Sequence, residues 1–242
     1  MTKPAAARRQ AALVYNPIKV DEKKLRAAVR ELSKAEGWEH PAFYPTTIQD
    51  AGQGATAQAL ARGVVVVLVA GGDGTVRAVS EAIANTGVPL AIVPSGTGNL
   101  LARNLALLLG SPDDMIRAAL SGSRHAIDIG WARITRDSGD ESEHAFVVLA
   151  GIGLDADMIA NTRPDLKKSV GSIAYAHGAA RSPANASPFR SLYQLDDAPF
   201  HSPKVHSILF PHCRPLPPPI ALVPAPSFPS RTPPLSLLRL SG

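Results

Sequence analysis

The chain has little cysteine and no long apolar run, and each shortage excludes a class of protein. Its 242 residues include one cysteine, Cys213, which excludes an internal disulfide and a cysteine-based metal cluster. No apolar run approaches the roughly 18 residues of a membrane-spanning helix. The N-terminal segment 1–17 has too few apolar residues for a signal peptide. We therefore expect a soluble, cytoplasmic protein, with any membrane contact being peripheral.

Acidic residues are absent after Asp197, whereas Lys204, Arg214, Arg231 and Arg239 follow it. These four cations supply most of the formal net charge of +5, so the rest of the chain is nearly neutral. No dense Lys/Arg stripe with interleaved aromatic residues accompanies this charge, and such a stripe is the usual mark of a nucleic-acid surface. The sequence therefore predicts no nucleic-acid partner, and it does not indicate an oligomeric state.

Residues 10–122 alternate between apolar strand-like runs and segments with helical periodicity. The expected strands are 11–17, 40–47, 64–69 and 89–94, and the expected helices are 22–36, 54–62, 75–85, 99–110 and 111–120. Asp21 and Ser111 are expected to cap two of the helices, and Gly37 and Gly87 to end two of them. Continuous apolar strands alternating with helices are typical of a parallel sheet covered on both faces. The first part of the chain is therefore predicted to be an α/β domain.

The pattern changes near residue 124, where strand-like segments follow one another with few helices between them. Over half of the chain's 22 prolines lie in residues 199–242, and proline cannot donate a hydrogen bond to a sheet. We predict three parts: an α/β domain at 1–123, an incomplete β-rich domain at 124–198, and a proline-rich, mostly irregular tail at 199–242.

The most informative turn is Gly71-Gly72-Asp73-Gly74-Thr75, which joins a valine-rich strand to a helix. Such a turn lies at the carboxyl end of a parallel sheet, where ligands of α/β proteins bind. Glycines let backbone amides approach an anion closely, and the helix N-terminus favours negative charge, so the expected ligand is a phosphate. A carboxylate beside a phosphate needs a cation between them, which predicts that Asp73 binds Mg²⁺ through water. The alternative is that Asp73 caps a helix starting at Thr75.

A second turn of the same design follows the next strand, in "VPSGTGNLLARNL" at 93–105. Two such turns at neighbouring strand ends are expected to form one site. Thr97 and Asn99 offer polar side chains, and Arg103 is expected either to meet a phosphate or a carboxylate or to form a surface ion pair. Neither turn matches a P-loop, a G-x-G-x-x-G dinucleotide loop or a G-x-S-x-G nucleophile turn.

The pair "GGDGTVRAV" and "VPSGTGNLLARNL", about 20 residues apart, resembles the catalytic domain of the diacylglycerol kinase family, which includes bacterial lipid kinases and sphingosine kinases. The resemblance continues in "VYNPIKV", "YPTT" and "GIGLDADMI". It implies a phosphofructokinase-like parallel α/β domain followed by a β-sandwich, here incomplete. It also implies an ATP-dependent, Mg²⁺-requiring transferase of phospholipid metabolism that phosphorylates a lipid hydroxyl such as that of diacylglycerol. NAD kinases share only the first motif and are disfavoured.

The resemblance also implies which residues contact ATP. They follow four strands and are Asn16, Pro17, Thr46, Gly71, Gly72, Asp73, Gly74, Thr75, Gly96, Thr97 and Asn99. The "YPTT" match leaves Thr46 and Thr47 open, with Thr46 favoured.

The resemblance leaves the catalytic base unassigned. Members of the family carry it in an Asp-Gly-Glu segment near the C-terminus, and this sequence has no carboxylate beyond Asp197. Asp155 and Asp157 are candidate substitutes, although capping a short helix is the more ordinary role for both. The alternative function is therefore a truncated, nucleotide-binding homologue without phosphotransfer, and a shifted reading frame in the tail is one hypothesis for its composition.

Overall fold

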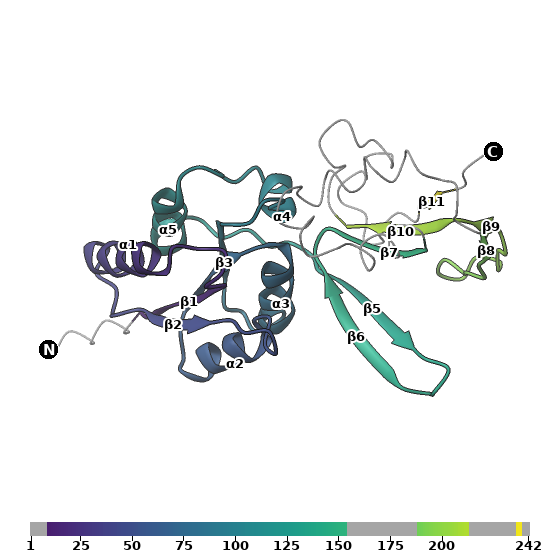
Figure 1. Ribbon diagram of the computed structural model, residues 1–242, viewed down its shortest axis with the longest axis horizontal. Helices are drawn as coiled ribbons and strands as arrows, with labels where there is room; N and C mark the ends of the chain where they lie inside the picture. The colour runs from purple at the N-terminus through teal and green to yellow at the C-terminus, as the bar shows by residue number, and fades with distance from the viewer. Residues whose placement is uncertain (1–8, 154–187, 213–235, 239–242) are drawn as a thin grey trace, which may run out of the picture. The chain divides into compact units, whose positions relative to one another are not determined.

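The computed structural model describes residues 9–153, 188–212 and 236–238 (Figure 1). The chain divides into two compact units, residues 1–147 and residues 148–242. Among the described helices, none has both the length and the apolar character required to cross a bilayer.

The first unit is built on a four-stranded parallel sheet in the order β2-β1-β3-β4. Its strands are β1 (Ala11–Tyr15), β2 (Ala42–Pro45), β3 (Val66–Gly71) and β4 (Leu90–Pro94). Every residue of β1 and β3 is buried, as the continuous apolar runs predict for strands covered on both faces. Because all four strands run the same way, the segments after Tyr15, Pro45, Gly71 and Pro94 leave the sheet at one edge.

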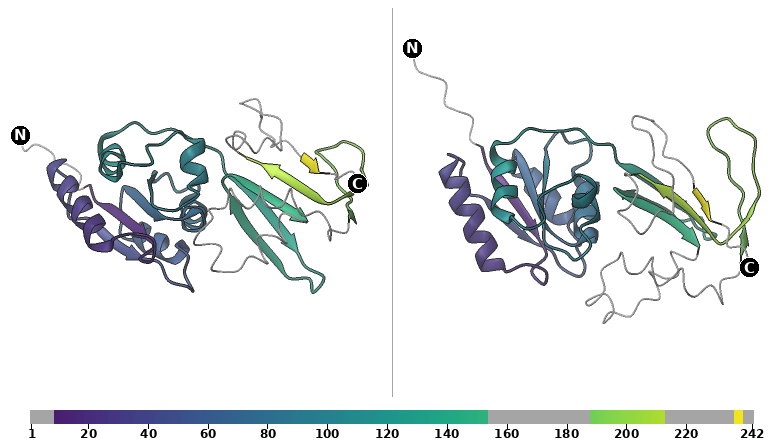
Figure 2. Two further views of the ribbon diagram at one scale, coloured as in Figure 1. Left: turned by 45° about the horizontal axis from the view of Figure 1, so that its top comes forward. Right: turned by 90° about the horizontal axis from the view of Figure 1, so that it is seen from above.

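Helices cover both faces of this sheet (Figures 1 and 2). The helices are α1 (Glu22–Ala35), α2 (Gln53–Ala61), α3 (Asp73–Ile83), α4 (Leu100–Asn104) and α5 (Pro112–Ser121). Helices α1 and α5 pack together on one face, while α2 and α3 pack together on the other. Alternate β1 residues, including Leu13, join a core with Val29 of α1 and Ile116 of α5.

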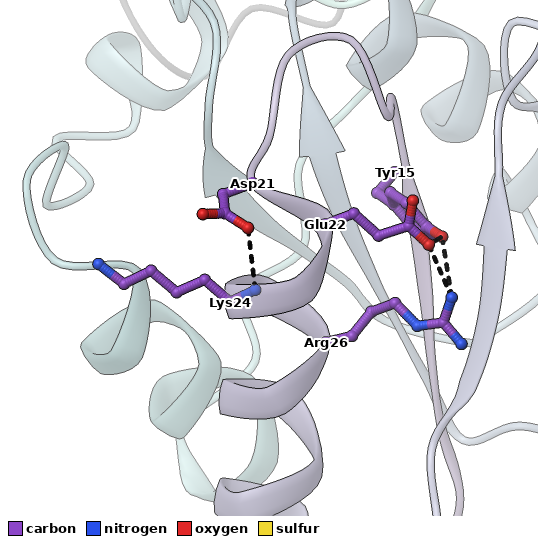
Figure 3. A network of polar contacts seen from close by, with 5 residues as sticks. All are labelled: Tyr15, Asp21, Glu22, Lys24 and Arg26. Carbon is purple, nitrogen blue, oxygen red and sulfur yellow. Dashed lines mark hydrogen bonds and ion pairs between the residues drawn. The ribbon is translucent and has the colours of Figure 1, made fainter.

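The boundaries of α1 are as the sequence predicts. Asp21 caps α1, because its carboxylate accepts a hydrogen bond of 3.0 Å from the Lys24 amide (Figure 3). Gly37 follows the end of α1 with a φ of +70°, a conformation that glycine adopts without strain. Ser111 occupies the capping position of α5, but its hydroxyl donates to the Asp114 carboxylate instead of accepting from a backbone amide.

An antiparallel hairpin completes the first unit. Its strands are β5 (Gly130–Thr135) and β6 (Glu141–Phe146). The hairpin contacts α3, and the first compact unit therefore extends to Val147 rather than ending at residue 123. Glu81 contributes to this contact, because its carboxylate accepts a hydrogen bond of 2.9 Å from the Ala145 amide.

The second unit contains short antiparallel strands. They are β7 (Leu149–Gly153), β8 (Phe189–Arg190), β9 (Lys204–Val205), β10 (Ser207–Pro211) and β11 (Ser236–Leu238). Strand β10 pairs with both β7 and β11, and β8 pairs with β9. Strands β9, β10 and β11 all lie in residues 199–242, the part that the sequence predicts to be mostly irregular. The antiparallel strands agree with the predicted partial β domain.

The Glu81 carboxylate joins three elements of the first unit and has a perturbed pKa. It also accepts hydrogen bonds from Arg77, at 2.6 Å, and from Gln53 of α2, at 3.2 Å. Burial raises the pKa of Glu81, but the hydrogen bonds from the Ala145 amide, Gln53 and Arg77 outweigh this effect and lower it below the ordinary value of 4.5. The folded state therefore favours the charged form of Glu81. The stability that this ionised carboxylate contributes is fully present above pH 4.5 and is lost as the pH falls through the lowered pKa.

Replacing Glu81 with glutamine should therefore destabilise the protein in a pH-dependent way. We expect the free energy of unfolding at pH 7 to fall by about 1 kcal/mol, since charge-assisted hydrogen bonds become neutral ones. The difference in free energy of unfolding between this variant and the unsubstituted protein should become smaller as the pH falls below 4.5. Urea unfolding across pH 3.5–7 measures this gap. Glu143→Gln in the same hairpin is the control, because its ion pair with Arg133 is exposed and should contribute little. A gap for Glu81→Gln that does not change with pH would contradict the assignment.

Candidate functional site: two glycine loops at one sheet edge

The first glycine loop connects β3 to α3, and the protein's own packing explains one of its glycines. A Cβ on Gly71 would lie 2.8 Å from the Cβ of Thr75, which is buried. Gly71 is therefore required by the close approach of Thr75. Gly72 is the residue that precedes the helix, with extended backbone (φ −85°, ψ 178°).

Gly72 and Gly74 are not explained in this way. Apart from the chain neighbours and, for Gly74, the backbone of its own helix, no atom of the described residues lies within 4 Å of the position that a Cβ would take at either residue. Neither residue has a positive φ, so the backbone conformation does not require glycine there. The space that a Cβ would fill at Gly72 and at Gly74 is thus not taken by the side chains packed around the loop. This open space is what close approach of a ligand to the loop amides requires.

The second loop connects β4 to α4 and is held by an asparagine. Asn99 adopts a left-handed conformation (φ 48°, ψ 46°), which asparagine tolerates better than most residues. Its side chain accepts a hydrogen bond of 2.9 Å from the Gly96 amide and donates one of 2.7 Å to the Gly96 carbonyl. The Nε of Arg103 donates to the Gly98 carbonyl at 2.8 Å, so this side chain supports its own loop; the described residues include no ion pair for it.

The two loops touch each other, as their positions after neighbouring strands predict. Gly71 at the end of β3 is paired in register with Pro94 at the end of β4. A Cβ on Gly96 would lie 2.8 Å from the Gly72 Cα and 3.3 Å from the Gly71 carbonyl oxygen. The structure therefore brings Gly71–Thr75 together with Gly96 and Asn99.

Asp73 links the loops through its side chain. Its Oδ1 accepts a hydrogen bond of 2.6 Å from the Leu100 amide, 27 residues away. The alternative in which Asp73 caps a helix from Thr75 is wrong, because α3 begins at Asp73 itself and Gly72 precedes it. Within the described residues, no group of three or more His, Cys, Asp and Glu side chains could hold a metal ion. Water and the oxygens of a bound phosphate are the usual further ligands of Mg²⁺ at a single carboxylate.

The remaining predicted contacts lie at the ends of β1 and β2, at the same edge. Asn16 follows β1, and its Oδ1 accepts from the Ile18 amide at 3.0 Å, while Pro17 is exposed. The Thr47 hydroxyl accepts from the Asp50 amide at 3.0 Å and so closes a local turn. Thr46 is buried, and its amide donates a hydrogen bond to the Tyr15 carbonyl.

Thr97, in the second glycine loop, is exposed. The candidate bases Asp155 and Asp157 lie outside the described residues.

A polar cluster that the motif comparison did not identify supports the end of β1 (Figure 3). The buried Tyr15 hydroxyl donates to Glu22 at 2.7 Å, and Arg26 donates to the same carboxylate at 2.7 Å. Burial and the Glu22 carboxylate raise the pKa of Tyr15, while the hydrogen bonds from Tyr15 and Arg26 lower the pKa of Glu22. In the sequence, only the spacing of Glu22 and Arg26 by four residues in a predicted helix indicates that these two side chains can pair.

The sequence motifs do not indicate a role for Asp50 either, although its side chain binds several backbone amides in the segment after β2. Its carboxylate accepts hydrogen bonds from the amides of Gly52, Gly54 and Ala55, at 2.9, 3.0 and 2.7 Å. These amides lie at the start of α2, where helices leave backbone donors without internal partners. Asp50 thus performs the capping that Gly52, the residue at the helix boundary, cannot provide.

Replacing Asp50 with alanine should lower the free energy of unfolding by about 1–2 kcal/mol, the usual cost of losing a helix cap. Thermal or urea unfolding would measure it. Asp137→Ala is the matched control, because Asp137 lies in the exposed turn of the β5–β6 hairpin. Equal stability of the Asp50→Ala and Asp137→Ala proteins would contradict the capping role.

Comparison with known proteins agrees with this arrangement. Residues 10–132 match the family model described as "Diacylglycerol kinase catalytic domain". A protein of Pseudomonas fluorescens named "Probable lipid kinase YegS-like" is 34% identical over 169 residues, which cover 69% of this chain and 52% of that protein. The diacylglycerol kinase of Mycobacterium tuberculosis is 38% identical over 100 residues, covering 41% of this chain and 31% of that protein. A solved diacylglycerol kinase structure from Bacillus anthracis has a TM-score of 0.63 at 23% identity, covering 89% of this chain and 69% of that chain.

The fold is therefore that of solved diacylglycerol kinases, with a parallel α/β unit and later antiparallel strands. Because the family match spans half of the chain, the protein belongs to the diacylglycerol kinase catalytic domain family. This confirms the resemblance identified in the sequence. The chain spans about half the length of the Pseudomonas relative and about a third of the Mycobacterium relative.

Proposed function

We propose that the protein is an ATP-dependent lipid kinase that transfers the γ-phosphate of ATP to a lipid hydroxyl, such as that of diacylglycerol. The observation that carries this proposal is the open space above Gly72 and Gly74, two glycines that the protein's own packing does not require. Family membership supports the reaction class, and the relatives named as lipid or diacylglycerol kinases support the substrate class.

In this proposal the nucleotide phosphates bind against the Gly71–Thr75 loop and the adjacent Gly96–Asn99 loop. Backbone amides near Gly72 and Gly74 donate to phosphate oxygens, and the α3 N-terminus favours their negative charge. Thr97 is exposed beside them, and Asn16, Pro17 and Thr46 lie at the same sheet edge. These residues position the phosphates for in-line transfer, a reaction in which positioning and charge stabilisation supply most of the catalysis.

Asp73 is the residue proposed to hold Mg²⁺, through water. Its carboxylate lies between the two loops, and only Oδ1 forms the hydrogen bond to Leu100. When bound, Mg²⁺ would neutralise charge on the phosphate oxygens. The base that accepts the lipid hydroxyl proton remains unassigned among the described residues. Because a diacylglycerol hydroxyl lies at a bilayer surface, we also propose peripheral membrane contact.

Transfer of labelled γ-phosphate from ATP to diacylglycerol in mixed micelles, with and without Mg²⁺, tests the proposal. We expect a labelled lipid that forms only with Mg²⁺. ATP binding without any transfer would support the alternative, a nucleotide-binding homologue that does not phosphorylate lipid. Absence of ATP binding would overturn both.

A further inference from the structure

The carboxylate of Asp73 forms a hydrogen bond within the protein itself. Its Oδ1 lies 2.6 Å from the amide nitrogen of Leu100, the first residue of α4. The first amides of a helix have no partner within the helix, so each needs an acceptor from elsewhere. An ionised carboxylate is the strongest acceptor that a side chain offers, and the short distance agrees with a charge-assisted bond.

The residue that would ordinarily cap α4 does not do so. Asn99 precedes the helix in a left-handed conformation and makes no side-chain bond to the amides of α4. Its side chain is committed to Gly96, with one accepted and one donated hydrogen bond. The first helical amide of the second loop is therefore bound by a residue of the first loop.

The same pair of loops is in close backbone contact. A Cβ on Gly96 would come within 2.8 Å of the Gly72 Cα, so the space between the two loops has no room for a side chain at Gly96. Next to this contact, the hydrogen bond between Asp73 of the first loop and the Leu100 amide connects the first loop to the helix that follows the second loop. Movement of the second loop away from the first would break the bond and leave the Leu100 amide without this acceptor.

We infer that Asp73 is a positioning residue that holds the two glycine loops in one arrangement before any ligand binds. This inference extends the proposed function and rests on it for the identity of the ligand, the phosphates of ATP. A preformed site binds more tightly because the ordering of its loops does not have to occur during binding. Asp73 would thus contribute to phosphate binding even without a metal ion.

Two substitutions separate this role from that of metal binding. Asp73→Asn removes the charge but keeps a carbonyl oxygen that can accept from the Leu100 amide, whereas Asp73→Ala removes both. In the absence of nucleotide and metal, we expect amide hydrogen exchange at Leu100 to be at least tenfold faster in Asp73→Ala than in Asp73→Asn or the unsubstituted protein. Should Asp73→Ala fail to fold, Asp73→Ser, whose side chain is too short to make the same contact, takes its place.

Titration with ATP in EDTA supplies the second measurement. We expect Asp73→Asn to bind within about threefold of the unsubstituted protein and Asp73→Ala to bind roughly tenfold more weakly or worse. Addition of Mg²⁺ should then strengthen binding only in the unsubstituted protein. Equal Leu100 exchange in all three proteins would overturn the inference. If no protein binds ATP while Leu100 exchange still separates the variants, the proposed function fails and the positioning role stands.

Discussion

Replacing Gly72 with valine should weaken nucleotide binding while leaving the fold intact. A Cβ at Gly72 would meet no described atom within 4 Å apart from its chain neighbours, and the extended backbone at Gly72 accepts a β-branched residue. A ligand bound against the loop would meet it directly. Overpacking of a fitted site costs about 1–3 kcal/mol, which corresponds to roughly 5- to 150-fold weaker ATP binding. Calorimetric titration with ATP and a thermal unfolding curve give both quantities.

Gly110→Val is the matched control for this prediction. Gly110 also has nothing within 4 Å of its Cβ position and has no positive φ, but it lies in the segment before α5 rather than in either glycine loop. We expect unchanged ATP affinity for Gly110→Val and similar unfolding temperatures for both variants. Full ATP affinity in Gly72→Val would show that the open space above the loop is not a phosphate site.

Replacing Gly96 with alanine should impair both binding and stability. Here the added Cβ would lie 2.8 Å from the Gly72 Cα and 3.1 Å from the Asn99 side-chain oxygen, so a backbone must shift. We expect the free energy of unfolding to fall by about 1–3 kcal/mol, as for overpacking elsewhere in proteins. ATP affinity should fall at least tenfold, because the loops can no longer take their paired arrangement.

Comparison of the two glycine variants is informative because their expected results differ. Gly72→Val should lose binding alone, whereas Gly96→Ala should lose binding and stability together. Urea unfolding and ATP titration on the same preparations measure both properties. An unaltered free energy of unfolding for Gly96→Ala would contradict the close contact between the loops.

The elements of the first unit could be predicted because their signals are local. The continuous apolar runs around Val14 and Val67 indicate buried parallel strands, and Asp21 caps α1 in the place where the sequence puts a cap. Glycine placement also predicted that the loops after β3 and β4 would meet, since neighbouring parallel strands end at one edge. These inferences needed only the period of the apolar residues and the chemistry of turns.

The contacts between distant residues could not be predicted in the same way. Nothing near Asp73 in the sequence indicates that its carboxylate binds the Leu100 amide, because that bond depends on how closely two loops approach. The three amides bound by Asp50 and the hairpin contact of Glu81 have the same character. A polar side chain can form several different hydrogen bonds, and the tertiary structure determines which of them it forms. The sequence alone shows only which hydrogen bonds are possible.

The most direct test of the account is a titration of isotopically labelled protein with ATP and Mg²⁺, followed by amide chemical shifts. We predict saturable shifts for the amides of Gly72 and Gly74 in the first loop and of Gly96 and Asn99 in the second, with little change at Gly139 in the β5–β6 turn. Shifts confined to residues away from these loops, or no shifts at all, would contradict the assignment of the glycine loops as the nucleotide site.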